Sequence, residues 1–433
     1  MGRVDSVGRV GPVGPVDLVG GVGASGGRGS TALLVTLGAL SAFGPLCMDM
    51  YLPALPGLAI SLSSTASAAQ LSLSACIIGL GLGQLVVGPF SDRLGRRRPL
   101  LVGLLLFVLT SALCAVTTSM TVLIVLRLLQ GTAGAAGIVL CRAIVADRFT
   151  GKAAAAYFST IAAINGLAPI PAPILGAQVL RIGTWRTVFW VLTGVGLALL
   201  VLTVVFVGES LPAGRRSTAG VFGSLQAFST LLKDRVFVGY ALAGGTVSAA
   251  LFGYISASPF LLQDGFGLSP QVFSFCFAAN AFGIVLMSTL SRYLLARTTS
   301  VPLLRWGVWQ CAVGAALLAM TLLGRFGLPM LLVALFVMVS SVGFALPHSS
   351  VLAMDLHRSV AGSASALLGA FQYACGAVTA RLVGFGDKTG GHALAFTALG
   401  PQRSPSAGCG WPVVQQVPGP SGPSPPRDPA RLV

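Results

Sequence analysis

Charged residues are scarce in this sequence. Lys, Arg, Asp and Glu together make up 9% of the 433 residues, whereas 55% of the residues are hydrophobic. Soluble domains usually carry roughly 25% charged residues, and a globule of this length could not cover its surface with so few. The missing charge excludes an ordinary soluble protein and predicts that a lipid bilayer surrounds most of the chain.

Residue groupings that bind metals or carry out catalysis are also missing. The eight cysteines are spread singly with no CxxC pair, and the three histidines form no ligand cluster. Neither a zinc site nor a disulfide framework is therefore expected. The sequence contains no GxSxG, HExxH or Walker motif, and a membrane-embedded enzyme would need such clustered groups. We predict that the protein is not an enzyme and holds no metal or cofactor.

Acidic residues are few, because 11 Asp and Glu stand against 27 Lys and Arg, for a net charge of +16. Such an excess can indicate nucleic-acid binding, which needs basic residues gathered on a solvated face with aromatic partners. Here the basic residues fall in short gaps between apolar stretches of about 20 residues, the length that spans hydrocarbon. The pattern predicts a lipid bilayer, and no nucleic acid, as the partner.

Eleven apolar stretches are long enough to cross a bilayer. They lie near residues 31–55, 69–90, 99–117, 121–143, 155–178, 187–208, 236–258, 270–291, 302–323, 328–349 and 361–383. Most of the basic residues lie in the gaps after even-numbered stretches, as Arg93 and Arg96 do. Because loops rich in Lys and Arg stay in the cytoplasm, these gaps and the N-terminus are predicted to be cytoplasmic.

Composition divides the chain into five parts. Residues 1–30 are rich in Gly and Val and are predicted to be a disordered leader without a secretory signal. Residues 31–208 hold six spans, 209–235 form a hydrophilic cytoplasmic linker, and 236–385 hold five more spans. Residues 386–433 are rich in Pro, Gly and Ser and lack an apolar run long enough for a twelfth span. This tail is either native disorder or the product of a shifted reading frame, and we favour a truncated or frame-shifted chain.

An ordered motif lies between the second and third spans. It reads Gly88-Pro-Phe-Ser-Asp92-Arg93-Leu-Gly95-Arg96-Arg97-Arg98. Gly88 and Gly95 would allow a tight turn and close helix contact. Asp92 would offset the positive end of the next helix or pair with a nearby Arg. A basic loop that only sets topology is the alternative, and the Gly-Asp-Gly spacing disfavours it.

Ionisable residues inside a membrane are costly and mark functional sites by default. Arg127 and Gln130 lie in the fourth span, beside a row of glycines that begins at Gly131 and would suit close helix packing. Asp49, in the first span, is the one acid in the predicted hydrocarbon zone of the first six spans. These residues are therefore the candidates for a coupling site.

The fifth span holds a proline-rich segment, Ala172-Pro173-Ile-Leu-Gly176-Ala177. Three prolines at positions 169, 171 and 173 would kink this helix whatever its function. A purely structural kink is therefore one interpretation of the segment. A functional signature is the other.

These segments together resemble the Major Facilitator Superfamily. The Gly88–Arg98 segment is similar to its signature loop, and the segment from Arg127 to Gly137 is similar to a second signature linked there to proton coupling. Pro173 and Gly176 resemble the helix signature of its drug:proton antiporters, although Ala172 and Ala177 stand where that pattern usually has Gly.

Three more segments look like those of the Bcr/CflA drug-resistance transporters, and the likeness runs from about residue 31 to 385. They are Asp49–Pro56 (DMYLPALP), Ser256–Phe260 (SASPF) and Gly362–Leu367 (GSASAL). The resemblance implies an all-α membrane protein of the major facilitator architecture, with two six-helix halves and an apparently missing twelfth helix. It also implies a monomer in the cell inner (plasma) membrane that handles chloramphenicol- or bicyclomycin-type antibiotics.

Residues and resemblance together predict proton-coupled efflux by alternating access, driven by the proton gradient. Asp49 and Arg127 both fall in the outer half of the membrane and are expected to face each other across the cavity. The carboxyl should be neutral when dehydrated and ionised when water or Arg127 approaches, so Asp49 is the predicted proton carrier.

Six polar residues in otherwise apolar surroundings are candidate drug contacts. They are Tyr51, Gln84, Asn165, Tyr254, Asn280 and Gln372. For each of them a hydrogen bond between helices is the alternative role.

Two other functional interpretations stay open. The first is an uptake symporter of the same fold, because the sequence distinguishes import from export only through the imperfect fifth-span signature. The second is an inactive remnant, because a missing twelfth helix would expose a packing face of the second half to lipid.

Overall fold

The computed structural model describes residues 28–216, 229–324, 326–355 and 361–384, and in these ranges the chain forms helices and short turns without a strand. The predicted all-α fold is therefore confirmed. The first helix begins at Arg28, inside the predicted leader. Residues 1–27, residues 217–228 of the predicted linker and the predicted tail lie outside the described residues.

The first half of the chain forms a bundle of long helices. In order they are α1 (Arg28–Asp49), η1 (Leu52–Ala54), α2 (Leu55–Ser61), α3 (Ala66–Leu94), α4 (Arg97–Val116), α5 (Met120–Arg148), α6 (Gly151–Leu167), α7 (Pro171–Ile182), α8 (Trp185–Phe206) and the short turn η2 (Ala213–Arg215). Thr65 and Ser119 cap α3 and α5 by accepting backbone N–H groups with their hydroxyls.

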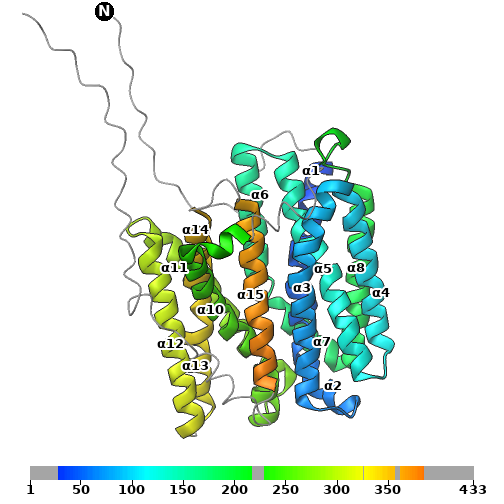
Figure 1. Ribbon diagram of the computed structural model, residues 1–433. Helices are drawn as coiled ribbons and strands as arrows, with labels where there is room; N and C mark the ends of the chain where they lie inside the picture. Colours follow the sequence, from blue (N-terminus) through cyan, green and yellow to red (C-terminus); the bar gives the residue numbers. More distant parts are fainter. Residues whose placement is uncertain (1–27, 217–228, 325, 356–360, 385–433) are drawn as a thin grey trace, which may run out of the picture.

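The second half forms the other bundle (Figure 1). Its elements are α10 (Arg235–Pro259), the π-helical turn η3 (Phe260–Gly265), α11 (Pro270–Leu295), α12 (Ser300–Gly324), α13 (Leu328–Ser340), α14 (Val342–Asp355) and α15 (Ala361–Gly384). In Figure 1, α11 to α14 lie on one side, the first half lies on the other, and α15 runs between them beside α3.

Nine helices of the described residues are long and apolar enough to cross a membrane, and ten are if the bent pair α6–α7 counts as one span. These ten correspond to the first ten predicted spans. Continuous helical units include Ala32–Ser61, which contains the η1 turn, and Leu328–Asp355, which joins α13 to α14. The eleventh predicted span, 361–383, is the 24-residue helix α15, which is not among the nine.

Irregular turns interrupt the first, fifth and seventh spans. The first breaks after Asp49, and a 3-10 turn that contains Pro53 begins at Leu52. The fifth bends by 45° between α6 and α7, at the proline-rich segment, which confirms the predicted kink. The seventh widens into the π-helical turn η3 directly after Pro259. Such breaks release backbone groups inside a membrane protein, and neighbouring helices or a cavity must satisfy them.

Small residues let α3 and α5 approach closely. A Cβ atom added at Gly131 of α5 would collide with the backbone carbonyl of Cys76, and one added at Gly79 of α3 would collide with that of Leu128. These contacts confirm that the glycine row of the fourth span is a packing face. Arg127 lies on α5, one turn before Gly131, so this packing also places the candidate coupling residues.

The two halves pack against each other along α3 and α15, and they also meet at one end of the bundle. We call it the α2 end, and we call the opposite end, where α3 meets α4, the Arg96 end. At the α2 end, η1 packs against α7, α10 and α11, and α2 packs against η3. Two hydrogen bonds cross between the halves there. Gln271 Nε2 donates to Ala177 O at 3.2 Å, and Ser274 Oγ donates to Pro173 O at 2.9 Å.

Replacing Gly131 by Ala is expected to destabilise the first half by about 1–3 kcal/mol, because the added methyl group meets a main-chain atom that cannot move aside. Gly194→Ala in α8 is the matched control, since nothing lies within 4 Å of its Cβ position. Thermal unfolding of the purified proteins measures the difference. Equal midpoints for the two variants would contradict the close approach of α3 and α5.

Removing both cross-half donors, with Gln271→Ala and Ser274→Ala together, is expected to favour opening of the α2 end. Interhelical hydrogen bonds in membranes average about 0.6 kcal/mol each, so the open fraction should rise by up to ~10-fold. A cysteine introduced at the buried position Leu52 should then react faster with a membrane-impermeant maleimide. Thr246→Ala is the control, because that exposed hydroxyl bonds only within its own helix. Unchanged labelling would show that these bonds do not hold the end closed.

Candidate functional site

Arg127 is a fully buried cation in the middle of the first half. Its Nη1 donates to Gln130 Oε1 at 2.5 Å and to the backbone carbonyl of Cys47 at 3.3 Å. The guanidinium carbon lies 4.7 Å from the Tyr51 ring centroid and 5.7 Å from that of Phe189, both suitable distances for cation–π attraction. Arg127 Nε and Nη2 have no hydrogen-bond partner among the described residues.

Gln130 extends this cluster to other helices, as expected for two polar residues three positions apart on one helix. Its Nε2 donates to Ser111 Oγ of α4 at 2.6 Å. The Tyr51 hydroxyl lies 2.9 Å from Ser72 Oγ of α3. The cluster around Arg127 therefore joins α1, α3, α4, α5 and α8. Tyr51 belongs to this cluster and is fully buried.

Asp49 does not pair with Arg127 in this conformation. Its side chain is 5% exposed, and among the described residues no hydrogen bond or ion pair includes it. Asp49 lies instead within electrostatic range of the hydroxyls of Tyr254 in α10 and Tyr373 in α15. The expected face-to-face arrangement is therefore absent here, because the backbone carbonyl of Cys47, two residues earlier, takes the place beside Arg127.

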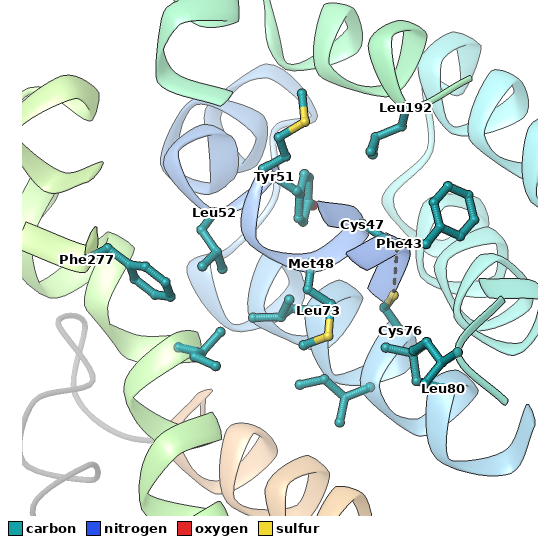
Figure 2. Close-up of a cluster of buried hydrophobic side chains, with 14 of the residues drawn as sticks. Phe43, Cys47, Met48, Tyr51, Leu52, Leu73, Cys76, Leu80, Leu192 and Phe277 are labelled. Atoms are coloured by element: carbon teal, nitrogen blue, oxygen red, sulfur yellow. Dashed lines mark hydrogen bonds between the residues drawn. The ribbon is translucent and has the colours of Figure 1, made fainter. Parts of the chain in front are cut away.

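The sequence did not single out two features of this region. Cys47 and Cys76 place their sulfur atoms 3.7 Å apart between α1 and α3 (Figure 2). Tyr373, directly after the candidate Gln372, is the α15 residue that lies near Asp49 and near Gly81 of α3. Because Tyr373 stands next to the polar candidate Gln372 in an apolar helix, the sequence could have indicated Tyr373 as a candidate too.

The remaining candidate pocket residues occupy different places. Asn280 Nδ2 donates to the Tyr254 hydroxyl at 2.9 Å, both from the second half. Gln84 Oε1 approaches Gly369 where α3 meets α15, and Gln372 approaches Gly244 inside the second half. Asn165 bonds back to Ile161 O of its own helix. Tyr254 and Asn280 thus make the hydrogen bond between helices that the alternative describes, Asn165 bonds within its own helix, and Gln84 lies where α3 of the first half meets α15 of the second.

The signature loop forms an ion-pair network at the Arg96 end. Arg96 Nη1 contacts Asp92 Oδ1 at 2.5 Å, and Arg96 Nε contacts Asp147 Oδ2 at 3.0 Å. Gly95 has φ +90, a conformation that favours glycine. The predicted turn at Gly95 and the predicted pairing of Asp92 are therefore confirmed.

Two other members of the loop play a smaller part. The close contact predicted at Gly88 is wrong, because nothing lies within 4 Å of the Cβ position there. Arg93 is exposed, as a residue that only contributes positive charge would be. The network therefore depends on Asp92, Gly95 and Arg96.

Glu209, which sequence analysis did not select, completes the network. Its carboxylate accepts the backbone N–H groups of Arg96 and Arg97 at the start of α4, at 2.8 and 3.4 Å, and those of Ser210 and Leu211. Partial burial alone would raise the pKa of this carboxyl, but the four N–H donors outweigh it and lower the pKa. Glu209 thus supplies the negative charge at the N-terminus of α4 that was expected from Asp92.

The segment that resembles the antiporter signature lies against the break in the first span. A Cβ atom at Gly176 would collide with the carbonyl of Met50, and the carbonyl of Pro173 accepts Ser274 of the second half. Pro173 and Gly176 therefore lie where α7 meets the first-span break and the second half. The absence of a side chain at Gly176 and the carbonyl of Pro173 both serve close contacts between helices.

Glu209→Gln is expected to reduce stability at neutral pH by about 0.3–1 kcal/mol, the usual value of a charge at an exposed helix end. Because the folded-state pKa of Glu209 is lowered, this contribution is present above the unfolded-state pKa. It is lost as the pH falls through the folded-state value. The gap in unfolding midpoint between wild type and Glu209→Gln should therefore close in acid. A gap that is independent of pH would contradict the capping role, and Asp264→Asn, an exposed acid in η3, is the control.

Comparison with known proteins places this geometry in a family. Residues 37–380 match the family model described as the Major Facilitator Superfamily. The chain is 40% identical over 360 residues to an uncharacterized MFS-type transporter YdgK of Bacillus subtilis, covering 83% of this chain and 90% of that protein.

Two relatives are named for drug resistance. A bicyclomycin resistance protein homolog of Haemophilus influenzae is 29% identical, covering 81% of this chain and 88% of that protein. A chloramphenicol resistance protein of Pseudomonas aeruginosa is 30% identical, covering 81% of this chain and 79% of that protein.

Solved structures share the fold. The nucleoside transporter NupG, solved as a point mutant, superimposes with a TM-score of 0.68 at 15% identity, covering 84% of this chain and 96% of that chain. At this identity the likeness shows the arrangement of helices alone.

Proposed function

We propose that this protein, which belongs to the Major Facilitator Superfamily, exports small drug-like molecules in exchange for protons. As a member of that family it is a multi-pass membrane transporter rather than an enzyme. The relatives named for bicyclomycin and chloramphenicol resistance support the substrate class. No ATP-binding motif is present in the sequence, so the energy would come from the proton gradient.

The observation that carries the proposal is a buried carboxyl without a partner, positioned between the two halves. Asp49 ends helix α1 directly before the break in the first span, and it lies within electrostatic range of the hydroxyls of Tyr254 and Tyr373 in the second half. A carboxylate at the C-terminal end of a helix is opposed by the helix dipole, and burial opposes the anion as well. Both effects favour the protonated form of Asp49 in this conformation.

Arg127 provides the other half of the coupling. Two of its donors, Nε and Nη2, are buried without a partner among the described residues, although a buried cation gains much from an anion. When the α2 end opens and η1 moves, the Asp49 carboxylate can approach these donors and release its proton. Gln130 holds the guanidinium from the opposite side. The proton affinity of Asp49 then depends on the conformation, which is the requirement for exchange.

Direction follows from the predicted topology. With the Arg96 end in the cytoplasm, the α2 end faces outward, and the conformation described is closed toward the outside. Drug would enter the cavity from the Arg96 end and leave at the α2 end, and protons would move the opposite way. The protein would act as a monomer in the inner membrane, since one chain contains both halves.

Expression in a drug-sensitive bacterium that lacks its main exporters tests the proposal. The chain should raise tolerance to chloramphenicol several-fold, and a protonophore should abolish the gain. Asp49→Asn should lose the gain completely while the protein stays in the membrane, because an amide cannot carry the proton. Asp264→Asn, which alters an exposed acid, is the matched control and should retain it.

The outcomes separate the open interpretations. Tolerance that is retained in Asp49→Asn would overturn the assignment of Asp49 as proton carrier. A gain that resists the protonophore would overturn proton coupling. No gain for chloramphenicol or bicyclomycin, with the protein confirmed in the membrane, would overturn drug export and favour an inactive chain.

A further inference from the structure

Two cysteines of the first half lie against each other beside the buried cation. Cys47, near the end of α1, and Cys76, in α3, place their Sγ atoms 3.7 Å apart, and Figure 2 shows the two side chains facing each other. Both are free thiols, and both are buried. They stand 29 residues apart in the chain, so only the fold brings them together. The proton-carrier mechanism uses neither thiol.

The contact between these thiols joins two helices that otherwise touch little. A buried thiol in a helix can bond back to its own backbone, as Cys141 Sγ does to Ile138 O at 3.2 Å. Cys47 and Cys76 hydrogen-bond to each other instead. Helix α1 packs chiefly on α5, α6 and α8 and meets α3 at few positions. The sulfur pair is therefore one of the few links between α1 and α3.

The neighbouring cation distinguishes Cys47 from an inert buried thiol. Arg127 Nη1 lies 3.6 Å from Cys47 Sγ and 3.3 Å from the Cys47 carbonyl oxygen. The reactive form of a cysteine is the thiolate, and a nearby guanidinium stabilises negative charge on sulfur. Arg127 takes part in no ion pair among the described residues. In this conformation, then, no carboxylate competes with the Cys47 sulfur for the cation.

We propose that Cys47 and Cys76 form a modification site, a dithiol that small uncharged two-electron oxidants such as hydrogen peroxide convert to a disulfide between α1 and α3. A disulfide bond is about 2 Å long, and rotation of two side chains that already face each other closes the remaining gap. Hydrogen peroxide is little larger than water. Cys47 lies two residues before Asp49, where the first span breaks, and movement at this break admits the oxidant.

The reaction balances in two steps. The Cys47 sulfur attacks one peroxide oxygen, the O–O bond breaks, and the released hydroxide takes the thiol proton to form water, which leaves a sulfenic acid. The Cys76 sulfur then attacks the Cys47 sulfur, the S–O bond breaks, and the hydroxide that leaves takes the Cys76 proton. The two thiols are oxidised to a disulfide, and the peroxide is reduced to two molecules of water.

The disulfide fixes the part of α1 that contacts Arg127. The Cys47 carbonyl accepts a hydrogen bond from Arg127, and Asp49 follows two residues later. Cys76 is itself held against α5, because a Cβ atom at Gly131 would collide with its carbonyl. Once tied to Cys76, the end of α1 can no longer bring Asp49 to the guanidinium, so transport stops. This consequence rests on the proposed function, whereas formation of the disulfide does not.

Counting thiols tests the modification site. Purified protein in nanodiscs is treated with hydrogen peroxide, denatured and labelled with a maleimide reagent, and linked peptides are identified by mass spectrometry. The wild type should lose two of its eight thiols, and dithiothreitol should restore both. Cys47→Ser and Cys76→Ser should each keep all their remaining thiols. Cys141→Ser, which removes an equally buried thiol that bonds within its own helix, is the matched control and should still lose two.

Chloramphenicol transport in proteoliposomes tests the consequence. Peroxide should abolish transport by the wild type and by Cys141→Ser, and dithiothreitol should restore it. Cys76→Ser should keep its own transport rate after the same treatment, because the partner for the disulfide is missing.

The two readouts separate the possible failures. A wild type that keeps all its thiols, or an equal loss of thiols in Cys76→Ser, would overturn the modification site. A Cys47–Cys76 disulfide that leaves transport unchanged would disprove the block on α1 while the site stands. Absence of transport in the untreated wild type would count against the proposed function alone, since the thiol count decides the site without it.

Discussion

The buried guanidinium of Arg127 is the constraint on which the first half depends. A cation in hydrocarbon is tolerated only when its donors and charge are matched, and five helices contribute to that match here. Gln130 and the carbonyl of Cys47 take its hydrogen bonds, and the rings of Tyr51 and Phe189 face its charge. The match is incomplete within the described part of the chain, because Arg127 Nε and Nη2 have no hydrogen-bond partner there. The two donors without a partner would attract an anion that comes near the guanidinium.

Irregular backbone converges where the halves meet. The break after Asp49, the bend between α6 and α7 and the π-helical turn after α10 all lie beside η1 or α2. In transporters, such interrupted helices bring backbone groups and polar side chains to the level of substrate. The regular helices α4, α8 and α12 carry many of the exposed apolar side chains and serve as the lipid-facing support. Asp49 and the segment Pro173–Gly176 thus lie at irregular backbone, whereas Arg127 and Gln130 lie on the regular helix α5.

The sequence alone predicted those features of the structure that depend on residues close together in the chain. Arg127 and Gln130 were selected as coupling candidates in one apolar span, and helix geometry accounts for the contact that they make. The turn at Gly95 followed from its setting between two helices. The role of Glu209 at the start of α4 was not predicted, because Glu209 lies 113 residues from Arg96 in the chain. No local sequence pattern reveals that these two residues come together. The arrangement of Asp49 and Arg127 was predicted wrongly for another reason. A helix that ends at Asp49 presents its carbonyls in one direction and the carboxyl in another, and spacing does not say which of them meets the cation.

The hydrogen bonds that close the α2 end are asymmetric in their chemistry. The donors are side chains of α11, Gln271 and Ser274, whereas both acceptors are main-chain carbonyls of α7. Every residue type presents a carbonyl, so α7 can exchange side chains during evolution without losing this closure, while α11 must keep its polar positions. Side chains of α7 can therefore change as a transporter adapts to new compounds, while the two hydrogen bonds that join α7 to α11 are kept.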